Sequence, residues 1–246
     1  MKLQDYKTPF LLALSLLTRI PAGSFTEITD KDSGKSALLY PLVGLIIGAI
    51  IYLPVLLFPN APSLVLAAII VTIWAIITGG LHLDGLTDSA DGWLGGLGDQ
   101  ERTLKIMKDP VVGAAGAIAL VCFLLLKFVS VTALIESDLA WLIMVAPLLG
   151  RTMILLTFKT TPYANKQGMA NTVVENLPEN TSWAVLIAGA VIGFFVSFWG
   201  VLLVLIGFYF LRRLMLKRLG GCTGDTVGAT VEISEMLFML GAVLVV

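Results

Sequence analysis

Apolar segments long enough to cross a membrane recur along most of the chain. They cover residues 37–58, 63–79, 111–135, 139–158, 183–211 and 226–246. A membrane-spanning helix needs roughly 20 apolar residues, so most of these segments are predicted to be single spans. The polar stretches between them are too short to form a separate soluble core. The pattern predicts an all-α, polytopic membrane protein with a single domain over residues 1–246.

The segment 183–211 is too long for one upright span. Its 29 residues would extend about 43 Å as a helix, whereas the hydrocarbon core is roughly 30 Å thick. A hairpin turn near Trp199 and Gly200 would place four polar loops on one side of the membrane, namely 21–36, 80–110, 159–182 and 212–225. These loops hold eleven Lys and Arg residues, and the connections on the other side hold none. Because basic loops favour the cytoplasm, we predict seven spans with the long loops in the cytoplasm.

The first apolar run follows two lysines, as in a secretory signal. Its sequence is PFLLALSLL, and Arg19 then interrupts the approach to any cleavage site. Signal peptides require small residues at that point. We therefore expect a short interfacial or re-entrant helix before the seven spans.

Composition narrows the classes of function. The chain is 57% hydrophobic and 13% charged, against roughly 25% charged in a soluble domain. Its 16 basic and 17 acidic residues give a net charge of −1, which excludes the basic excess of a nucleic-acid-binding protein. The two cysteines, Cys122 and Cys222, match no metal or redox spacing, and we interpret both as structural.

The richest polar segment, GGLHLDGLTDSADGWLGGLG, directly follows the second apolar segment. Asp84, Asp88 and Asp91 stand at i, i+4 and i+7, which places all three on one face if the segment is helical. Carboxylates so arranged repel one another, and Mg²⁺ would reverse that repulsion because it prefers oxygen ligands together with phosphate. A solvated polar face is the alternative. Gly85 and Gly92 make such a face less favourable and indicate close approach of a ligand or a neighbouring backbone.

Candidate phosphate-binding groups lie on both sides of these aspartates. His82 is the only histidine; it is interpreted either as a hydrogen-bonded structural group or as a group that binds phosphate or holds a carboxylate. Arg102, Lys105 and Lys108 recur at three-residue spacing and so share one side of a short helix. They suit phosphate held beside a metal, and they suit anionic-lipid contact or topology control equally well.

A second polar cluster, GGCTGDTVGATVEISE, precedes and enters the last apolar segment. A glycine-rich turn before a helix leaves backbone N–H groups free for an anion, which nominates Thr223, Gly224 and Asp225. Glu232 shares a face with Asp225, and Glu235 lies deeper in the span. An intramembrane carboxylate is a candidate functional group. The alternative is that these glutamates are buried partners of basic residues inside other spans, namely Lys127 and Arg151.

Several strings together resemble the cobalamin synthases, the adenosylcobinamide-GDP ribazoletransferase family. They are TRIP, GGLHLDGLTDSADG, IMKDPVVGAAGA, GRTMILL, PYANKQGMA and GGCTGDTVGATVEISE, in this order. The resemblance covers nearly the whole chain, and its aspartate and TGDTVGA motifs are highly specific. The aspartate set also resembles, more weakly, the motif of CDP-alcohol phosphotransferases.

The resemblance implies that adenosylcobinamide-GDP is joined to α-ribazole or its 5′-phosphate with release of GMP. It implies a prokaryotic inner membrane, a cytoplasm-facing site, Mg²⁺, and small-molecule substrates as partners beside the lipid bilayer; a homo-oligomer is left open. The expected catalytic residues are Asp84, Asp88, Asp91 and Asp225, the first three also binding the metal. The expected substrate-binding residues are His82, Arg102, Lys105, Lys108, Arg151, Thr223, Gly224 and Glu232.

Three other readings compete with this one. A lipid phosphotransferase with a CDP-linked donor should space its aspartates more widely, whereas this set closes within eight residues. A transporter would use intramembrane charges near the midplane, whereas the densest polar motif lies at a membrane boundary. A purely structural subunit would leave the aspartates unexplained.

Overall fold

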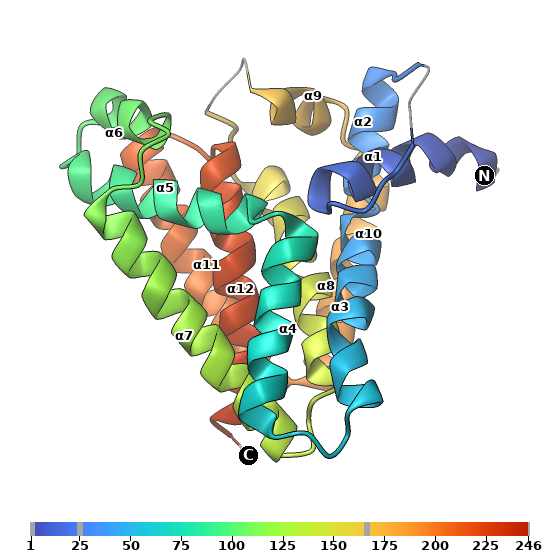
Figure 1. Ribbon diagram of the computed structural model, residues 1–246. Coiled ribbons are helices and arrows are strands. Elements are labelled where there is room, and N and C mark those ends of the chain that lie inside the picture. The colour runs from blue at the N-terminus through green and yellow to red at the C-terminus, as the bar shows by residue number, and fades with distance from the viewer. Residues whose placement is uncertain (1–2, 24–26, 165–167, 246) are drawn as a thin grey trace.

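A bundle of upright helices forms the body of the protein (Figure 1). The computed structural model describes residues 3–23, 27–164 and 168–245. The bundle helices are α3 (Tyr40–Leu57), α4 (Ser63–Thr78), α7 (Ala114–Glu136), α8 (Leu142–Thr160), α10 (Glu179–Val196), α11 (Phe198–Leu219) and α12 (Gly224–Val243). Within the described residues the only β-type pairing is an isolated bridge between Tyr163 and Cys222. The prediction of an all-α polytopic fold is confirmed.

The second apolar segment forms a short helix that is followed by a sharp bend. Six helices among the described residues are long and apolar enough to cross a membrane, and α4 joins them only as a pair with α5 (Leu81–Gly95), from which it is bent by 89°. The 16 residues of α4 reach about 24 Å. The chain turns at Gly79 and Gly80, whose φ angles of 63° and 70° favour glycine. Helix α5 therefore does not continue α4 in a straight line.

The long apolar segment near the C-terminus is a hairpin, as predicted. Helices α10 and α11 are separated by Ser197 alone, and its hydroxyl accepts a hydrogen bond from Gly200 N at 3.1 Å, which caps α11. The chain reverses at the lower end of the bundle (Figure 1). The turn lies two residues before the predicted position, where the Ser197 side chain caps the start of α11.

The polar connections gather at one end of the bundle. Helices α2 (Asp30–Ala37), α6 (Gln100–Met107) and α9 (Met169–Glu175) lie at the top in Figure 1, and α5 crosses just beneath α6. The N-terminal η1 (Leu3–Tyr6) and the short apolar α1 (Lys7–Leu17) lie across the same end. The connections α3–α4 and α7–α8 lie at the other end with the C-terminus. The arrangement confirms that the basic loops share one side.

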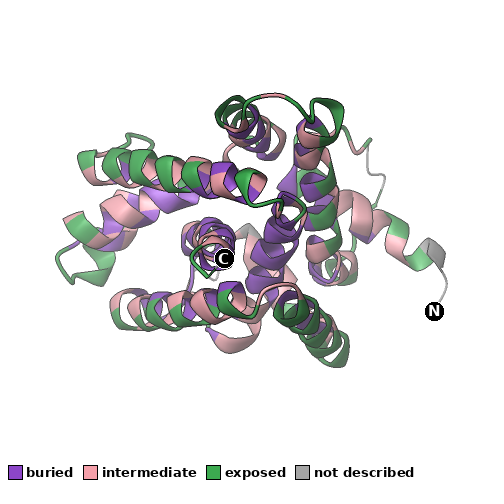
Figure 2. Ribbon diagram, turned by 90° about the horizontal axis from the view of Figure 1, so that it is seen from below, coloured by how far each residue is buried: buried purple, intermediate pink, exposed green. Residues whose placement is uncertain are grey.

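Helix α12 is the centre of the bundle. Of the 18 most apolar consecutive residues of α12, 78% are buried, and the corresponding share for α8 is 67%; both shares are well above those of the outer helices. Figure 2 shows buried residues concentrated around the C-terminal helix. Close contacts are made by small residues, since a Cβ at Gly44 or Gly48 of α3 would overlap the backbone of α8. Small residues allow such approach where lipid gives no hydrophobic driving force.

Candidate active site

The two acidic segments lie side by side although more than 130 residues separate them. Helix α5 crosses the first turns of α12, where a Cβ at Gly85 would lie 2.6 Å from the backbone oxygen of Asp225. A Cβ at Gly228 would lie 3.3 Å from the Cα of His82. Because both glycines lack a side chain, the two backbones pack in direct contact. The glycine of the aspartate motif thus serves the approach of a neighbouring backbone.

The carboxylates at the junction of α5 and α12 influence one another's pKa electrostatically. Asp84 is exposed, while Asp88 and Asp225 are half-buried. Partial burial, followed by the negative charges of Asp84, Asp225 and Asp91, raises the pKa of Asp88 to about 6. Nearby negative charges disfavour the ionised form of a carboxyl group. The structure therefore assembles a concentrated negative potential from α5 and α12 together.

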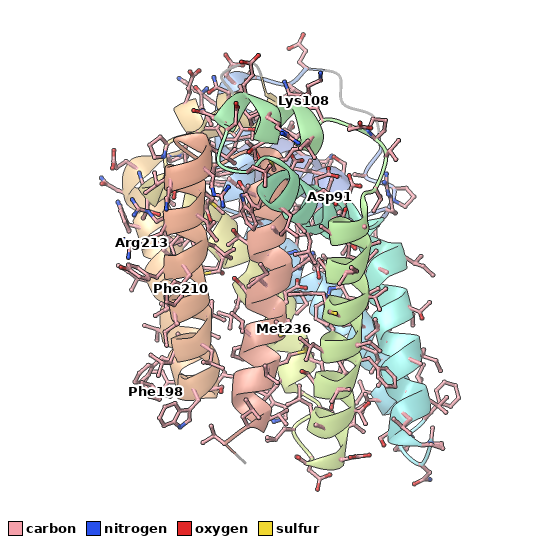
Figure 3. The ribbon with its side chains drawn as sticks, turned by 90° about the vertical axis from the view of Figure 1, so that its left-hand side faces the viewer. Asp91, Lys108, Phe198, Phe210, Arg213 and Met236 are labelled. Atoms are coloured by element: carbon pink, nitrogen blue, oxygen red, sulfur yellow. The ribbon has the colours of Figure 1, made fainter. Side chains whose placement is uncertain are left out.

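Asp91 has a structural task that the sequence reasoning missed. Its carboxylate oxygens accept hydrogen bonds from Gly113 N at 2.7 Å and Gly116 N at 2.8 Å. These N–H groups belong to the start of α7, whose first turn has no partners within the helix. Figure 3 shows Asp91 where α5 meets the upper end of α7. The glycines that open this span were the signal, since a Cβ at Gly113 or Gly116 would overlap the carboxylate.

No preformed three-ligand metal site is visible. Among residues 3–23, 27–164 and 168–245 there is no group of three or more His, Cys, Asp or Glu side chains that could hold a metal ion. With Asp91 bound to α7, the exposed Asp84 and half-buried Asp88 are the members of the predicted triad that remain open to a ligand. Mg²⁺ commonly uses only one or two protein carboxylates, with waters and phosphate oxygens completing its shell.

His82 faces the interior of the bundle. Its Nδ1 lies 3.3 Å from Nη2 of Arg151 on α8. Burial, together with the positive charges of Arg151 and Lys127, lowers the pKa of His82 well below its ordinary value. The ring is therefore neutral near pH 7 and provides no cation for a phosphate. Of the two interpretations made from sequence, the geometry matches the hydrogen-bonded structural group.

The intramembrane charges pair with one another. Lys127 Nζ lies 2.9 Å from Glu232 and 2.8 Å from Glu235, and Arg151 forms an ion pair with the other oxygen of Glu235. All four side chains are at most 3% exposed. These contacts confirm the alternative that the glutamates are buried partners of Lys127 and Arg151. Neither Arg151 nor Glu232 lines a described cavity, so both reach a substrate only through other groups.

The basic stripe lies on α6, above α5 and beside α11. Arg102, Lys105 and Lys108 are all exposed, and Figure 3 shows Lys108 above Asp91 at the upper end of the molecule. Of the three, only Lys108 lines a cavity that also contains Asp225. Arg102 and Lys105 extend the positive surface next to that cavity and make no described contact with the carboxylates.

The glycine-rich turn is anchored from two directions. Thr223 and Thr226 form a reciprocal cap, in which each side chain accepts the other's backbone N–H, at 3.3 and 2.8 Å. Cys222 exchanges backbone hydrogen bonds with Pro162 and Ala164 at 2.8 and 2.9 Å. The predicted Thr223 is thus a buried capping residue, whereas Gly224 is exposed. The cap fixes the first turn of α12, which carries Asp225.

Two adjoining cavities meet at this turn. The larger, of about 290 Å³, is lined by His82, Asp84 and mainly apolar side chains; the smaller, of about 250 Å³, contains Lys108 and Thr223. Tyr163, Gly224 and Asp225 belong to both. Burial and the nearby Cys222 and Asp225 raise the pKa of Tyr163, so its phenol is protonated and available as a donor. The site list made from sequence omitted Tyr163, for which position in the PYANKQGMA string was the available signal.

Comparisons with known proteins agree over nearly the whole chain. A family model described as cobalamin-5-phosphate synthase matches residues 9–243. An adenosylcobinamide-GDP ribazoletransferase of Acinetobacter baumannii (strain ATCC 17978) is 45% identical over 238 residues, covering 94% of this chain and 95% of the relative. The protein of the same description from Pseudomonas putida (strain GB-1) is 43% identical over 236 residues, covering 96% and 98%. No solved structure gives a significant match.

Proposed function

The chain belongs to the cobalamin-5-phosphate synthase family, and we propose that it is an Mg²⁺-dependent adenosylcobinamide-GDP ribazoletransferase whose reaction takes place at the junction of α5 and α12. The observation that carries the location is the direct packing of Gly85 against the Asp225 backbone. It brings Asp84 of α5 and Asp225 of α12 to the wall of the larger cavity, and Asp225 also lines the adjoining smaller one. The acceptor is α-ribazole or its 5′-phosphate.

The reaction is a displacement at a phosphoanhydride. A hydroxyl oxygen of the acceptor forms a bond to the phosphorus next to the corrinoid, the bond from that phosphorus to the bridging oxygen breaks, and GMP leaves with that oxygen. The hydroxyl proton is released to solvent. Such reactions need charge neutralisation and positioning more than covalent help from the protein, and this chain offers carboxylates, a lysine and a helix N-terminus for these tasks.

The donor set fits Mg²⁺ as an incomplete ligand shell. Asp84 and Asp88 would hold the ion, while Asp225 lies close enough to Asp88 to influence its charge. When bound, the ion would neutralise the phosphate charge that develops during the displacement. Asp91 would contribute by fixing α5 against the start of α7.

The protein's cations receive the phosphates of the donor. Lys108 shares the smaller cavity with Gly224 and Asp225, next to the N-terminus of α12, where the helix dipole favours an anion. Arg102 and Lys105 raise the local concentration of the anionic donor from the surface. His82, Arg151 and Glu232 act from beneath by holding the wall of the site in place.

The distribution of charge supports a location for the site. The protein is a multi-pass membrane protein, and we place it in a prokaryotic inner membrane with the α5–α12 junction facing the cytoplasm. Ten of the eleven basic residues of the four long loops fall in the part of the chain that the structure describes, and their loops lie at that end, in agreement with the positive-inside rule. The soluble, nucleotide-linked donor would arrive from there.

An assay of GMP release tests the proposal. Membranes containing the protein are given adenosylcobinamide-GDP and α-ribazole, with Mg²⁺ or with EDTA. Asp84→Asn, Asp88→Asn and Asp225→Asn should each lower the rate by at least a hundredfold, and Asp138→Asn, at the other end of the bundle, should not. Release of GMP at the full rate in EDTA would refute the proposed dependence on Mg²⁺. If no GMP is released under any condition, the proposed activity is wrong.

A further inference from the structure

Resting on the proposed function, we propose that the larger cavity is the acceptor subsite and binds the dimethylbenzimidazole base of α-ribazole. Nothing in the family comparison assigns a subsite to either substrate. The assignment rests on the different linings of the two cavities and on the three residues that they share.

The larger cavity has one polar wall and otherwise apolar surroundings. His82, Asp84 and Asp225 come from α5 and the first turn of α12, which pack against each other. The remaining surface is contributed mainly by Leu17 of α1, Phe158 of α8 and other side chains of α1, α8 and α9. Ligand pockets of this kind hold an apolar, often aromatic group and orient it with a few polar atoms. A bicyclic aromatic base that carries a ribose matches this division.

Volume excludes the alternative occupant. Ligand pockets range from roughly 300 to 1,000 Å³, and the larger cavity, at about 290 Å³, stands at the lower limit. A corrin macrocycle with its amide side chains is far larger than either cavity. On this proposal the corrinoid remains outside the cavities and inserts only its nucleotide-linked phosphates.

The smaller cavity has the chemistry that these phosphates need. Lys108 provides a cation, and the wall is formed by the anchored turn at Thr223 and Gly224. It lies on the other side of Tyr163, Gly224 and Asp225, which belong to both cavities. A ribose hydroxyl reaching from the larger cavity and a phosphorus in the smaller one would therefore meet at these three residues. Tyr163 separates the two bound groups and helps to position the hydroxyl.

Two alanines allow each cavity to be filled separately. Ala170 lines only the larger cavity, and Ala164 lines only the smaller one. Ala170→Trp should raise the KM for α-ribazole at least tenfold and leave the KM for adenosylcobinamide-GDP within twofold. Ala164→Trp should give the opposite pattern. Ala117→Trp, on the exposed surface of α7, is the matched control and should change neither KM.

The base itself supplies a second test, which needs no variant that might disturb folding. In the wild-type protein, removal of each methyl group from the benzimidazole should lower kcat/KM about fourfold, the value of one buried CH₂. Binding of α-ribazole to the purified protein, measured by isothermal titration calorimetry without the donor, should weaken in the same order. Val173→Phe, which fills the larger cavity from α9, should weaken it as well.

The outcomes separate this inference from the function on which it rests. A wild-type protein that releases no GMP contradicts the activity itself. A wild-type protein that is active, but in which Ala170→Trp raises only the KM for the donor, contradicts the subsite assignment alone. Equal effects of both tryptophans on both KM values, or rates that ignore the methyl groups, would also overturn it.

Discussion

Replacing Lys127 by methionine should destabilise the protein strongly, because this lysine neutralises two buried glutamates. Its ammonium lies 2.9 Å from Glu232 and 2.8 Å from Glu235, and it stands over the ring of Trp74, with 3.7 Å from Nζ to the centroid. Methionine has a similar length and apolar stem. The substitution therefore removes the charge while leaving most of the packing intact.

The expected loss in the free energy of unfolding follows from the charges that remain buried in the Lys127→Met variant. Arg151 alone would face two carboxylates, and removing one partner from a buried pair costs about 3–5 kcal/mol. The variant has a second route, which is to take up a proton on one carboxylate. From the ordinary glutamate pKa near 4.3, this uptake costs about 3.7 kcal/mol at pH 7. Both routes predict a loss of about 4 kcal/mol in the free energy of unfolding.

Lys127→Met combined with Glu232→Gln restores neutrality and should recover at least about 2 kcal/mol of that loss. Unfolding by denaturing detergent in mixed micelles, followed by circular dichroism, measures all members of this double-mutant cycle. Exposed Lys217→Met on α11 is the control. A Lys127→Met protein within about 1 kcal/mol of wild type, or a double variant no more stable than the single one, would refute a coupled buried network.

Three further changes test other parts of the structure. Gly85→Val should lower the free energy of unfolding by about 1–3 kcal/mol through overpacking and should lower the rate of GMP release at least tenfold. Gly95→Ala should be tolerated, because the added methyl group meets only a flexible isoleucine side chain. Equal effects of the two substitutions would contradict the close crossing of α5 and α12. Asp91→Ala should cost about 1 kcal/mol as a lost helix cap, measured by thermal unfolding without substrate; an unchanged melting temperature would argue against the cap. In a cysteine-free background, a cysteine at Glu101 should react with an impermeant maleimide only from the cytoplasm and one at Ser137 only from the other side; reversed labelling would invert the topology.

The parts of the fold that could be predicted from the sequence are those that depend only on the length and charge of individual segments. The length of 183–211 and the one-sided distribution of basic loops required a hairpin, and the structure has one, with its break at Ser197. The short N-terminal helix was expected because Arg19 interrupts a run already too short to span. Each of these inferences used only segment length and charge, which do not depend on which helices become neighbours.

The parts that could not be predicted depend on neighbours. Asp91 belongs to the same i, i+4, i+7 series as Asp84 and Asp88, yet its carboxylate oxygens accept hydrogen bonds from the start of α7. The spacing of residues along a helix does not distinguish a metal ligand from a helix cap. The pairing of Glu235 with Lys127 was one of two open interpretations, because sequence gives intramembrane charges without their contacts. Tyr163 became a candidate because it lines both cavities, in a segment whose backbone is hydrogen-bonded to Cys222.

The bend at Gly79 and Gly80 explains how acidic chemistry is combined with a membrane fold. Carboxylates on a straight continuation of α4 would project away from the bundle, and carboxylates within it would require buried partners of the kind that Glu232 and Glu235 have. Turning α5 by about a right angle instead lays its aspartates over the N-terminal turn of α12. The ion pairs beneath then tie α12 to α7 and α8, so the same helix is held at depth by charge pairs and presents Asp225 at its exposed end. Loosening that buried network should therefore impair GMP release as well as stability, although none of its four members lines either of the two cavities described at the site.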